Sequence, residues 1–337
     1  MIQSPSLNTG EPMLTPNTNR FTIFPIEHSK IWEAFKQHER AAWVAEEIDY
    51  NSDYHEWTTL TDDERFFIEN ILAFFAGSDG IVMENINKNF SNEVQWPEAR
   101  AFYSFQSYIE QVHSEVYSTL IETYIKDPRR KDQMFRAIEE IPCVKKKAEW
   151  AMKWMDQGNA SFAERLVAFA VVEGVFFSGS FCAIYWLKSR GIMVSGLGKS
   201  NELIARDENL HCSFAIMLYN QLVNKLSAER IHEIFKSAVE IETEFITESI
   251  RCDLVGMNSG DMVKYIKFVA DFWVTQLITD KGKKCAKAYP RIKNPFPFMD
   301  KNGLENKTNF FEQKVTEYAR NTKKPDFTKL GSETEGF

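Results

Sequence analysis

The chain has 337 residues, with 40 Lys and Arg against 48 Asp and Glu, which gives a formal net charge of −8. This balance argues against nucleic acid as the main partner, because no basic surplus is available to neutralise phosphates. Gly (15) and Pro (11) are scarce and Phe (27) is frequent, which favours long helices around a large core. The five Cys form no Cys-x-x-Cys pair and the N-terminus lacks a secretory signal pattern, so a reducing, cytoplasmic location is expected.

The first 20 residues show no apolar periodicity and are expected to form a mobile arm. From residue 28, apolar residues recur every three or four positions, which predicts a helix that ends at Asp49. A second helix is predicted to begin at Thr61, which forms a capping box with Glu64, and to run towards Phe90. Further helices are predicted over about 98–126, 131–140, 143–157, 160–190, 200–224, 227–252, 258–279 and 309–320, with a loop over 280–308. No run alternates with period two, so the fold is expected to be all-α.

Residues 167–187 form an apolar stretch whose only charged residue is Glu173. The stretch is long enough to span a bilayer, but a core helix surrounded by other helices has the same composition. We favour the core helix, because no second span accompanies it and a central charge is costly in a membrane. A carboxylate in a protein core needs a cation, a metal or a proton, so the stretch predicts a buried positive partner for Glu173.

The spacing Glu-x-x-His occurs at Glu110–His113, Glu208–His211 and Glu229–His232. Residues three apart share one face of a helix, so both side chains of a pair can bind one ion. The first two pairs lie among apolar and aromatic residues, whereas the third is surrounded by charged residues and is interpreted as a solvated helix face. Any single pair can be a structural ion pair, but two apolar pairs favour a metal site.

Two buried Glu-x-x-His pairs and two single carboxylates are the ligand set of the ferritin-like di-iron and di-manganese bundles. Glu173 supplies one single carboxylate. For the other, Asp49 at the end of the first predicted helix competes with Glu46 and Glu47. Oxygen donors with a few nitrogens suit iron or manganese, so the sequence predicts a ferritin-like helical bundle, with additional helices, around two such ions.

Tyr117 lies four residues beyond His113, which places its phenol on the face of the helix that carries the predicted ligands. Phe177 and Phe181 lie four and eight residues beyond Glu173, on that ligand's face. These aromatic residues can be plain packing, or they can shield a tyrosine beside a redox metal from water. The composition does not choose between the two interpretations.

Several long motifs resemble the small, radical-bearing subunit of class I ribonucleotide reductase of the eukaryotic kind. They are FPIEHSKIW, WVAEEIDY, LAFFAGSDGIV, SYIEQVHSEVYS, AVVEGVFFSGSF, SNELIARDENLH and KTNFFEQKVTEY, in this order from about residue 21 to 320. The resemblance implies a ferritin-like homodimer. It also implies two iron ions per chain, joined by an oxo bridge, that react with O2 to leave a stable tyrosyl radical; manganese is the alternative metal.

The resemblance also assigns roles to individual residues. The implied metal ligands are Asp49, Glu110, His113, Glu173, Glu208 and His211. The implied radical site is Tyr117, in a pocket lined by Phe177, Phe181 and Ile204. The implied radical-transfer path consists of Trp32, Asp207 as the link from His113 towards that tryptophan, and Tyr318 as the exit.

The expected organisation is an N-terminal arm (1–20), a ferritin-like di-metal domain (21–320) and a flexible tail (321–337) that docks the large catalytic subunit. The tail keeps spaced apolar anchors at Phe327, Leu330 and Phe337. Two departures from the family concern this docking more than the chemistry: the stretch ADFWVTQLITDKGKKCAKAYPRIKNPF and the ending GSETEGF. An iron-storage protein and a di-iron oxygenase or desaturase remain the alternative functions. An iron-storage protein needs neither a tyrosine one turn beyond a ligand nor a long tail, and an oxygenase or desaturase would keep the ligands but open a substrate channel.

Overall fold

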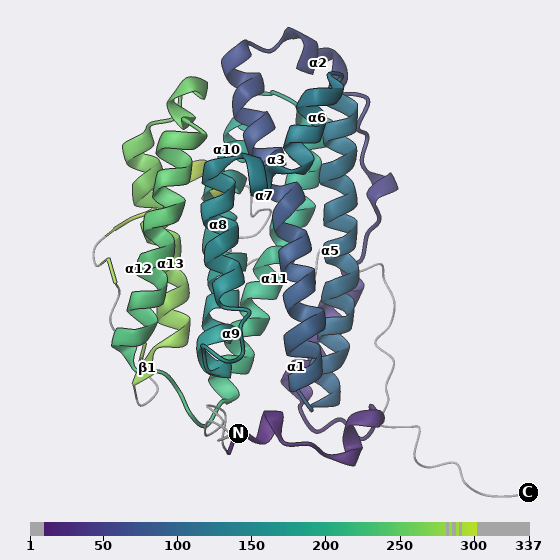
Figure 1. Ribbon diagram of the computed structural model, residues 1–337, viewed down its shortest axis with the longest axis vertical. Coiled ribbons are helices and arrows are strands. Elements are labelled where there is room, and N and C mark those ends of the chain that lie inside the picture. The colour runs from purple at the N-terminus through teal and green to yellow at the C-terminus, as the bar shows by residue number, and fades with distance from the viewer. Residues whose placement is uncertain (1–9, 281–282, 285–287, 290–291, 302–337) are drawn as a thin grey trace, which may run out of the picture.

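The computed structural model describes residues 10–280, 283–284, 288–289 and 292–301. In this part of the chain, long helices run roughly along one axis (Figure 1). The α-helices are α1 (Ser29–Arg40), α2 (Tyr54–Thr59), α3 (Asp62–Asn85), α4 (Ser91–Glu93), α5 (Pro97–Tyr124), α6 (Pro128–Phe135), α7 (Ala137–Glu140), α8 (Pro142–Lys153), α9 (Phe162–Val171), α10 (Ser178–Ser189), α11 (Lys199–Gln221), α12 (Ala228–Glu244), α13 (Ser259–Leu277) and α14 (Pro297–Lys301).

Shorter elements join or interrupt these helices. The 3-10 helices are η1 (Pro12–Leu14), η2 (Thr18–Phe21), η3 (Ala45–Glu47) and η8 (Cys252–Val255). The π-helical segments are η4 (Ile86–Phe90), η5 (Val172–Phe176), η6 (Val194–Gly198) and η7 (Phe245–Ser249). The strands β1 (Thr279–Asp280) and β2 (Lys283–Lys284) pair antiparallel, so the segment predicted as a loop over 280–308 contains this short pairing and α14.

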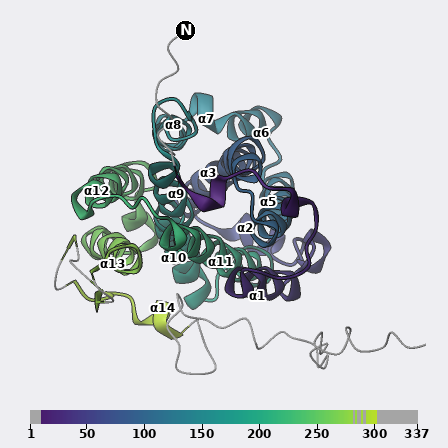
Figure 2. The same cartoon turned by 90° about the horizontal axis from the view of Figure 1, so that it is seen from below.

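Seen end-on, α3, α5, α9, α10 and α11 surround the middle of the molecule (Figure 2). Helix α1 packs against α5 and α11, and α12 and α13 pack against each other on the opposite side. The predicted start of α3 is confirmed, because Thr61 Oγ1 accepts from Glu64 N at 3.2 Å in a capping box. Ser161 and Glu164 form a second capping box at the start of α9. These caps define where the central helices begin and hence the level of their inward side chains.

Two helical stretches, Asp62–Glu93 and Phe162–Ser189, are long and apolar enough to cross a membrane, so the expectation that no second span accompanies residues 167–187 is wrong. Their most apolar windows are 61% and 100% buried inside the protein. The second contains the stretch 167–187, and its full enclosure by protein supports the core-helix interpretation. Its apolar surface is covered by neighbouring helices, so its length alone gives no reason to invoke a lipid environment.

The helix predicted from residue 28 to Asp49 is wrong in its second half, because α1 ends at Arg40. Beyond it, Ala41, Trp43 and Ala45 are buried whereas Ala42 and Val44 are exposed. This alternation is the burial pattern of an extended segment lying on a core. The apolar spacing therefore reflects an irregular segment whose side chains enter the bundle, and the change of direction after α1 decides where Trp43 lies.

The mobile arm predicted over residues 1–20 is wrong for residues 10–20. Met13 is 1% exposed and its carbonyl accepts from Gln95 N at 2.8 Å. The carboxylate of Glu11 accepts from the backbone N–H groups of Val223 and Asn224 at 3.0 and 2.6 Å. The buried Glu11 and Met13 and these long-range hydrogen bonds tie the segment to the bundle. Residues 1–9, the helix predicted over 309–320 and the tail over 321–337 lie outside the described residues.

Candidate metal centre and tyrosine pocket

Four buried side chains meet at the centre of the bundle: Glu110 from α5, Glu173 from η5, and Glu208 and His211 from α11. Their ligand atoms all lie within 4.8 Å of one another. His211 Nδ1 is 2.9 Å from Glu110 Oε1 and 2.8 Å from Glu208 Oε2. Three carboxylates and an imidazole at this separation can share cations, and all four residues are among the predicted ligands.

His113 completes the second Glu-x-x-His pair at the same place. Its Nδ1 lies 3.0 Å from Glu208 Oε1 and 3.5 Å from Glu110 Oε2. The structure therefore brings together five of the six predicted ligands, because the helical spacing turns each pair inward and α5 packs against α11. The third pair, Glu229–His232, lies on α12, where Glu229 is exposed as expected for a solvated face.

The structure does not bring Asp49 to this cluster. Asp49 is exposed, and its carboxylate accepts from Ser52 N at 3.1 Å and from the Ser52 hydroxyl. The prediction of Asp49 as a ligand is therefore wrong in this structure. The physical reason is that the chain leaves the helix after Arg40, so Asp49 does not lie on an inward-facing helical turn.

Asp79 on α3 is a further buried carboxylate on which Glu110, His113 and Glu208 act electrostatically. It is 1% exposed, and its Oδ2 has no hydrogen-bond partner among the described residues. Burial, and then the charge of Glu110, raise its pKa well above the usual value. A signal for it exists in the sequence, since Asp79 is the only charged residue between Ile71 and Val82. Asp79 is thus a lone charge in an apolar stretch, as Glu173 is, and it needs a cation or a proton for the same reason.

Without a cation, the buried carboxylates of the cluster repel one another. Burial alone would lower the pKa values of the two histidines, but the surrounding carboxylates raise the pKa of His113 well above the usual value and that of His211 to about 9. Burial and repulsion by Glu208 raise the pKa of Glu173, and its Oε2, like Glu110 Oε2, has no hydrogen-bond partner among the described residues. Orphaned carboxylate oxygens that converge with imidazoles fit a binuclear site for hard divalent metals.

Glu173 lies in a π-helical segment, which leaves backbone carbonyls to be satisfied from outside the helix. The Gly174 carbonyl accepts from Trp273 Nε1 at 3.2 Å, and the Phe176 carbonyl accepts from Lys147 Nζ at 2.6 Å. A Cβ at Gly174 would lie 2.6 Å from Trp273 Nε1, so only glycine permits this approach. Side chains of α13 and α8 thus hold the segment that carries Glu173.

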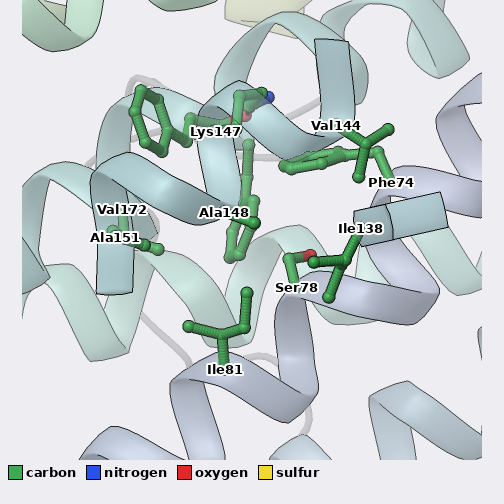
Figure 3. A pocket seen from close by; sticks show the side chains of 11 residues that line it. Phe74, Ser78, Ile81, Ile138, Val144, Lys147, Ala148, Ala151 and Val172 are labelled. Carbon is green, nitrogen blue, oxygen red and sulfur yellow. Dashed lines mark hydrogen bonds between the residues drawn. The ribbon is translucent and has the colours of Figure 1, made fainter. Parts of the chain in front are cut away.

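Lys147 also lies on the wall of an apolar pocket between α3, α8 and η5 (Figure 3). Its Nζ is 2.7 Å from Glu242 Oε2 and 3.4 Å from the centre of the Phe74 ring. Burial lowers the pKa of Lys147 to about 8, although Glu242 acts in the opposite direction. The buried ammonium group therefore has a carboxylate, a carbonyl and an aromatic face as its partners.

Tyr117 is 1% exposed, and its hydroxyl has no hydrogen-bond partner among the described residues. Its ring stacks on Phe75, with centroids 4.5 Å apart and planes 4° from parallel. Phe75 in turn contacts Phe177 and Phe181, at centroid distances of 5.7 and 5.1 Å. Phe75 therefore links the ring of Tyr117 to the two predicted pocket residues. Phe75 itself was not predicted as a pocket residue. Ile204 is buried on α11, one turn before Glu208.

The tyrosine lies within the electrostatic field of the cluster. Burial, and then the charges of Asp79, Glu208 and Glu110, raise the pKa of Tyr117 well above its usual value. The phenol is therefore neutral at physiological pH. Water is excluded from it by a wall of aromatic rings.

A hydrogen-bonded chain leaves the cluster on the side of His113. Its Nε2 is 3.3 Å from Asp207 Oδ2, and Trp43 Nε1 donates to the same oxygen at 2.7 Å. Although burial alone would raise the pKa of Asp207, the guanidinium of Arg206 and then the contact with His113 lower it to about 2. Asp207 therefore stays ionised between the imidazole and the indole.

The tryptophan in contact with Asp207 is Trp43 and not the predicted Trp32, so that prediction is wrong. Trp32 lies on α1, half-buried, and its ring contacts Phe24 and Phe35. The reason is again the end of α1 at Arg40, after which the extended segment turns Trp43 into the bundle. The motif WVAEEIDY begins with Trp43, so the sequence contained the signal. The predicted exit, Tyr318, lies outside the described residues.

Comparisons with known proteins agree with this arrangement. The chain is 55% identical over 314 residues to the ribonucleoside-diphosphate reductase small subunit of Dictyostelium discoideum, covering 92% of this chain and 89% of the relative. It is 53% identical over 310 residues to the human ribonucleoside-diphosphate reductase subunit M2, covering 92% of this chain and 78% of the relative. The solved structure of the ribonucleotide reductase Rnr4 homodimer from Saccharomyces cerevisiae superposes with a TM-score of 0.78 at 37% identity, covering 86% of this chain and 89% of that protein's chain.

These similarities confirm the resemblance seen in the sequence and the all-α, ferritin-like fold. The family model of the ribonucleotide reductase small chain matches residues 20–285, a span that contains both Glu-x-x-His pairs, Asp79, Glu173 and Tyr117. On the strength of this match and of relatives more than half identical over most of its length, the chain belongs to the ribonucleotide reductase small chain family.

Proposed function

We propose that this chain is the radical-bearing small subunit of a ribonucleoside-diphosphate reductase, active only together with a large catalytic subunit. The observation that carries the proposal is a tyrosine one turn beyond His113, enclosed by aromatic rings, next to a buried cluster of carboxylates and imidazoles. The names of the close relatives support the same activity.

The proposed ligands of two metal ions are Asp79, Glu110, His113, Glu173, Glu208 and His211. Five carboxylates and imidazoles come from the predicted set, and Asp79 takes the place of Asp49. Iron fits this donor set, and manganese fits it as well. When bound, the ions supply the reaction with O2 that oxidises a nearby phenol.

Tyr117 is the proposed site of that oxidation. A phenoxyl radical survives only where water and other reductants are kept away, and the stacked ring of Phe75 backed by Phe177 and Phe181 provides that shield. Loss of an electron must be accompanied by loss of the phenol proton. Asp79 is a carboxylate whose charge acts on the phenol and whose Oδ2 has no hydrogen-bond partner among the described residues, and it is the group that we expect to hold that proton or to orient its acceptor.

Transfer of the radical towards the large subunit is proposed to begin along His113, Asp207 and Trp43. Hydrogen bonds connect the three side chains, so movement of an electron can be coupled to small shifts of protons. The ionised Asp207 accepts from the indole N–H and stabilises positive charge that develops on the indole ring. Tyr318 remains the proposed exit of the path.

The proposed assembly is a homodimer that binds the large subunit through the tail over residues 321–337. A cytoplasmic location is proposed as well, and Cys212, a buried thiol outside any disulfide, suits a reducing compartment. Tail docking makes a direct prediction: removal of the last seven residues should leave metal binding intact but abolish turnover with the large subunit.

The proposal is tested by adding Fe(II) and O2 to metal-free protein and by measuring metal content and electron paramagnetic resonance. Two ions per chain and an organic-radical signal are expected, followed by ribonucleotide reduction when the large subunit is added. A protein that binds two ions but yields no radical signal would contradict the proposal and favour another di-metal activity of this fold.

A further inference from the structure

The two imidazoles of the cluster differ in what lies behind them. Each turns Nδ1 towards the carboxylates, and each has an outer nitrogen, Nε2, that faces away. The outer nitrogen of His113 faces the carboxylate of Asp207 at 3.3 Å. The outer nitrogen of His211 faces another imidazole instead, with 3.2 Å between His211 Nε2 and His38 Nε2.

His38 is held firmly in this position. It is 1% exposed and lies in the last turn of α1. Its ring packs against Phe102 and Phe105, at centroid distances of 5.1 and 4.7 Å, and lies 4.8 Å from the ring of His211. Its own Nδ1 has no hydrogen-bond partner among the described residues. The ring is therefore fixed by packing, and its one polar contact is with His211.

The protons on these rings follow from the geometry. A metal bound at His211 Nδ1 needs the lone pair of that nitrogen, so the ring proton must lie on Nε2. Without metal, a neutral ring that donates from Nδ1 to Glu110 or Glu208 leaves Nε2 without a proton, so the metal-bound state is the one that fixes the direction of the outer contact. With metal bound, His211 Nε2–H donates and His38 Nε2 accepts. His38 must then be the neutral tautomer that carries its proton on Nδ1.

We propose that His38 is a positioning residue that fixes the tautomer and the ring orientation of His211. This inference rests on the proposed metal centre. Because His38 is a neutral acceptor whereas Asp207 is an anionic one, the two outer contacts polarise their imidazoles unequally. The two imidazole ligands thus differ in basicity. Among the described residues, His113 but not His211 is connected to a tryptophan by hydrogen bonds through a carboxylate.

If His38 served only for packing, replacing its hydrogen-bond acceptor with an apolar side chain of similar size would not affect metal binding. Three variants separate the packing role from the acceptor role. His38→Leu fills the site but removes the acceptor. His38→Gln places an acceptor oxygen near the former Nε2. His232→Leu changes a histidine of the outlying Glu229–His232 pair and serves as the control. Far-ultraviolet circular dichroism and thermal melts establish that each variant is folded before metal is added.

The measurement is the affinity of metal-free protein for Mn(II) and Fe(II), by competition with a chelator. Loss of such an outer contact typically lowers metal affinity about 10–100-fold. We expect His38→Leu to lose affinity by this factor at one of the two ions, His38→Gln to stay close to wild type, and His232→Leu to equal it. Wild-type affinity in His38→Leu, or an equal loss in both His38 variants, would overturn the proposal.

A second readout uses protein loaded with Zn(II), a diamagnetic ion that also binds imidazole and carboxylate ligands. In protein labelled with ¹⁵N-histidine, the imidazole resonances that disappear in His38→Gln belong to His38. Their shifts should be those of a neutral ring protonated at Nδ1. A proton on Nε2 would overturn the inference even if wild-type protein bound two ions. If the Zn(II)-loaded protein shows His38 protonated at Nδ1 but Fe(II) and O2 yield no radical signal, the proposed function fails while the role of His38 in the His211 contact stands.

Discussion

Replacing Tyr117 with Phe removes one oxygen atom from the centre of the bundle. Tyr117 is 1% exposed, its ring stacks on Phe75 at 4.5 Å, and its hydroxyl has no hydrogen-bond partner among the described residues. The phenylalanine ring can keep the same stack. We therefore expect the variant to fold and to bind metal as the wild type does, but to give no radical signal and no turnover with the large subunit.

The effect on stability follows from the orphaned hydroxyl. A buried polar group without a partner costs about 1–3 kcal/mol, so metal-free Tyr117→Phe should be more stable than the wild type by at most ~1–3 kcal/mol. Tyr103 offers a matched control on the same helix. It is 0% exposed, stacks on Phe90 at 5.6 Å, and its hydroxyl also has no hydrogen-bond partner among the described residues. Tyr103→Phe should gain similar stability and keep the radical.

Urea unfolding of the metal-free variants and electron paramagnetic resonance after addition of Fe(II) and O2 provide the two measurements. A radical of wild-type intensity in Tyr117→Phe would refute the assignment. Its loss in Tyr103→Phe, with Tyr117 intact, would show that the radical had been assigned to the wrong tyrosine. A loss of stability in both variants would refute the stabilisation expected from removing the orphaned hydroxyls.

Three further outcomes are expected. Asp79→Asn should lower the metal content below two ions per chain whereas Asp49→Asn should leave it unchanged, as measured by elemental analysis; the reverse pattern would restore the sequence-based ligand. Trp43→Phe should keep metals and radical but reduce turnover by orders of magnitude, with Trp32→Phe close to wild type in the same assay. Burial lowers the pKa of Lys147 from 10.5 to about 8, so between these pH values the unfolded chain binds more protons than the folded chain. The unfolding free energy of the wild type should therefore rise with pH over this range relative to that of Lys147→Met. Parallel pH profiles would contradict this.

Much of the site could be predicted because it depends on short-range helical geometry. Glu110 with His113, and Glu208 with His211, share a face in any α-helix, and their apolar neighbours indicate that this face is inside. Tyr117 follows by the same periodicity. Glu173 follows from the cost of a charge in an apolar stretch. In each case the deciding information lies within about two turns of one helix, so no knowledge of the tertiary packing was required.

The residues that were assigned wrongly or not predicted depend on how helices meet. Asp49 and Trp32 were assigned from the family resemblance, and Asp49 also from a predicted helix that in the structure ends at Arg40. Asp79, like Phe75, comes from α3, which is far from the other site residues in the sequence. Helical periodicity states which side chains share a face. It does not state which faces pack together.

The contact between His38 and His211 shows the same division. The two residues are separated by 173 positions, and no pattern around His38 distinguishes it from the other histidines of the chain. By itself the sequence determined the helices, the two inward pairs and the tyrosine beside them. The sequence contains a signal for Asp79 and for Trp43, but the tertiary structure decided which acidic residue joins the cluster, which tryptophan lies behind Asp207 and which imidazole lies behind His211. Such non-local contacts follow from the packing of whole helices, which local spacing does not encode.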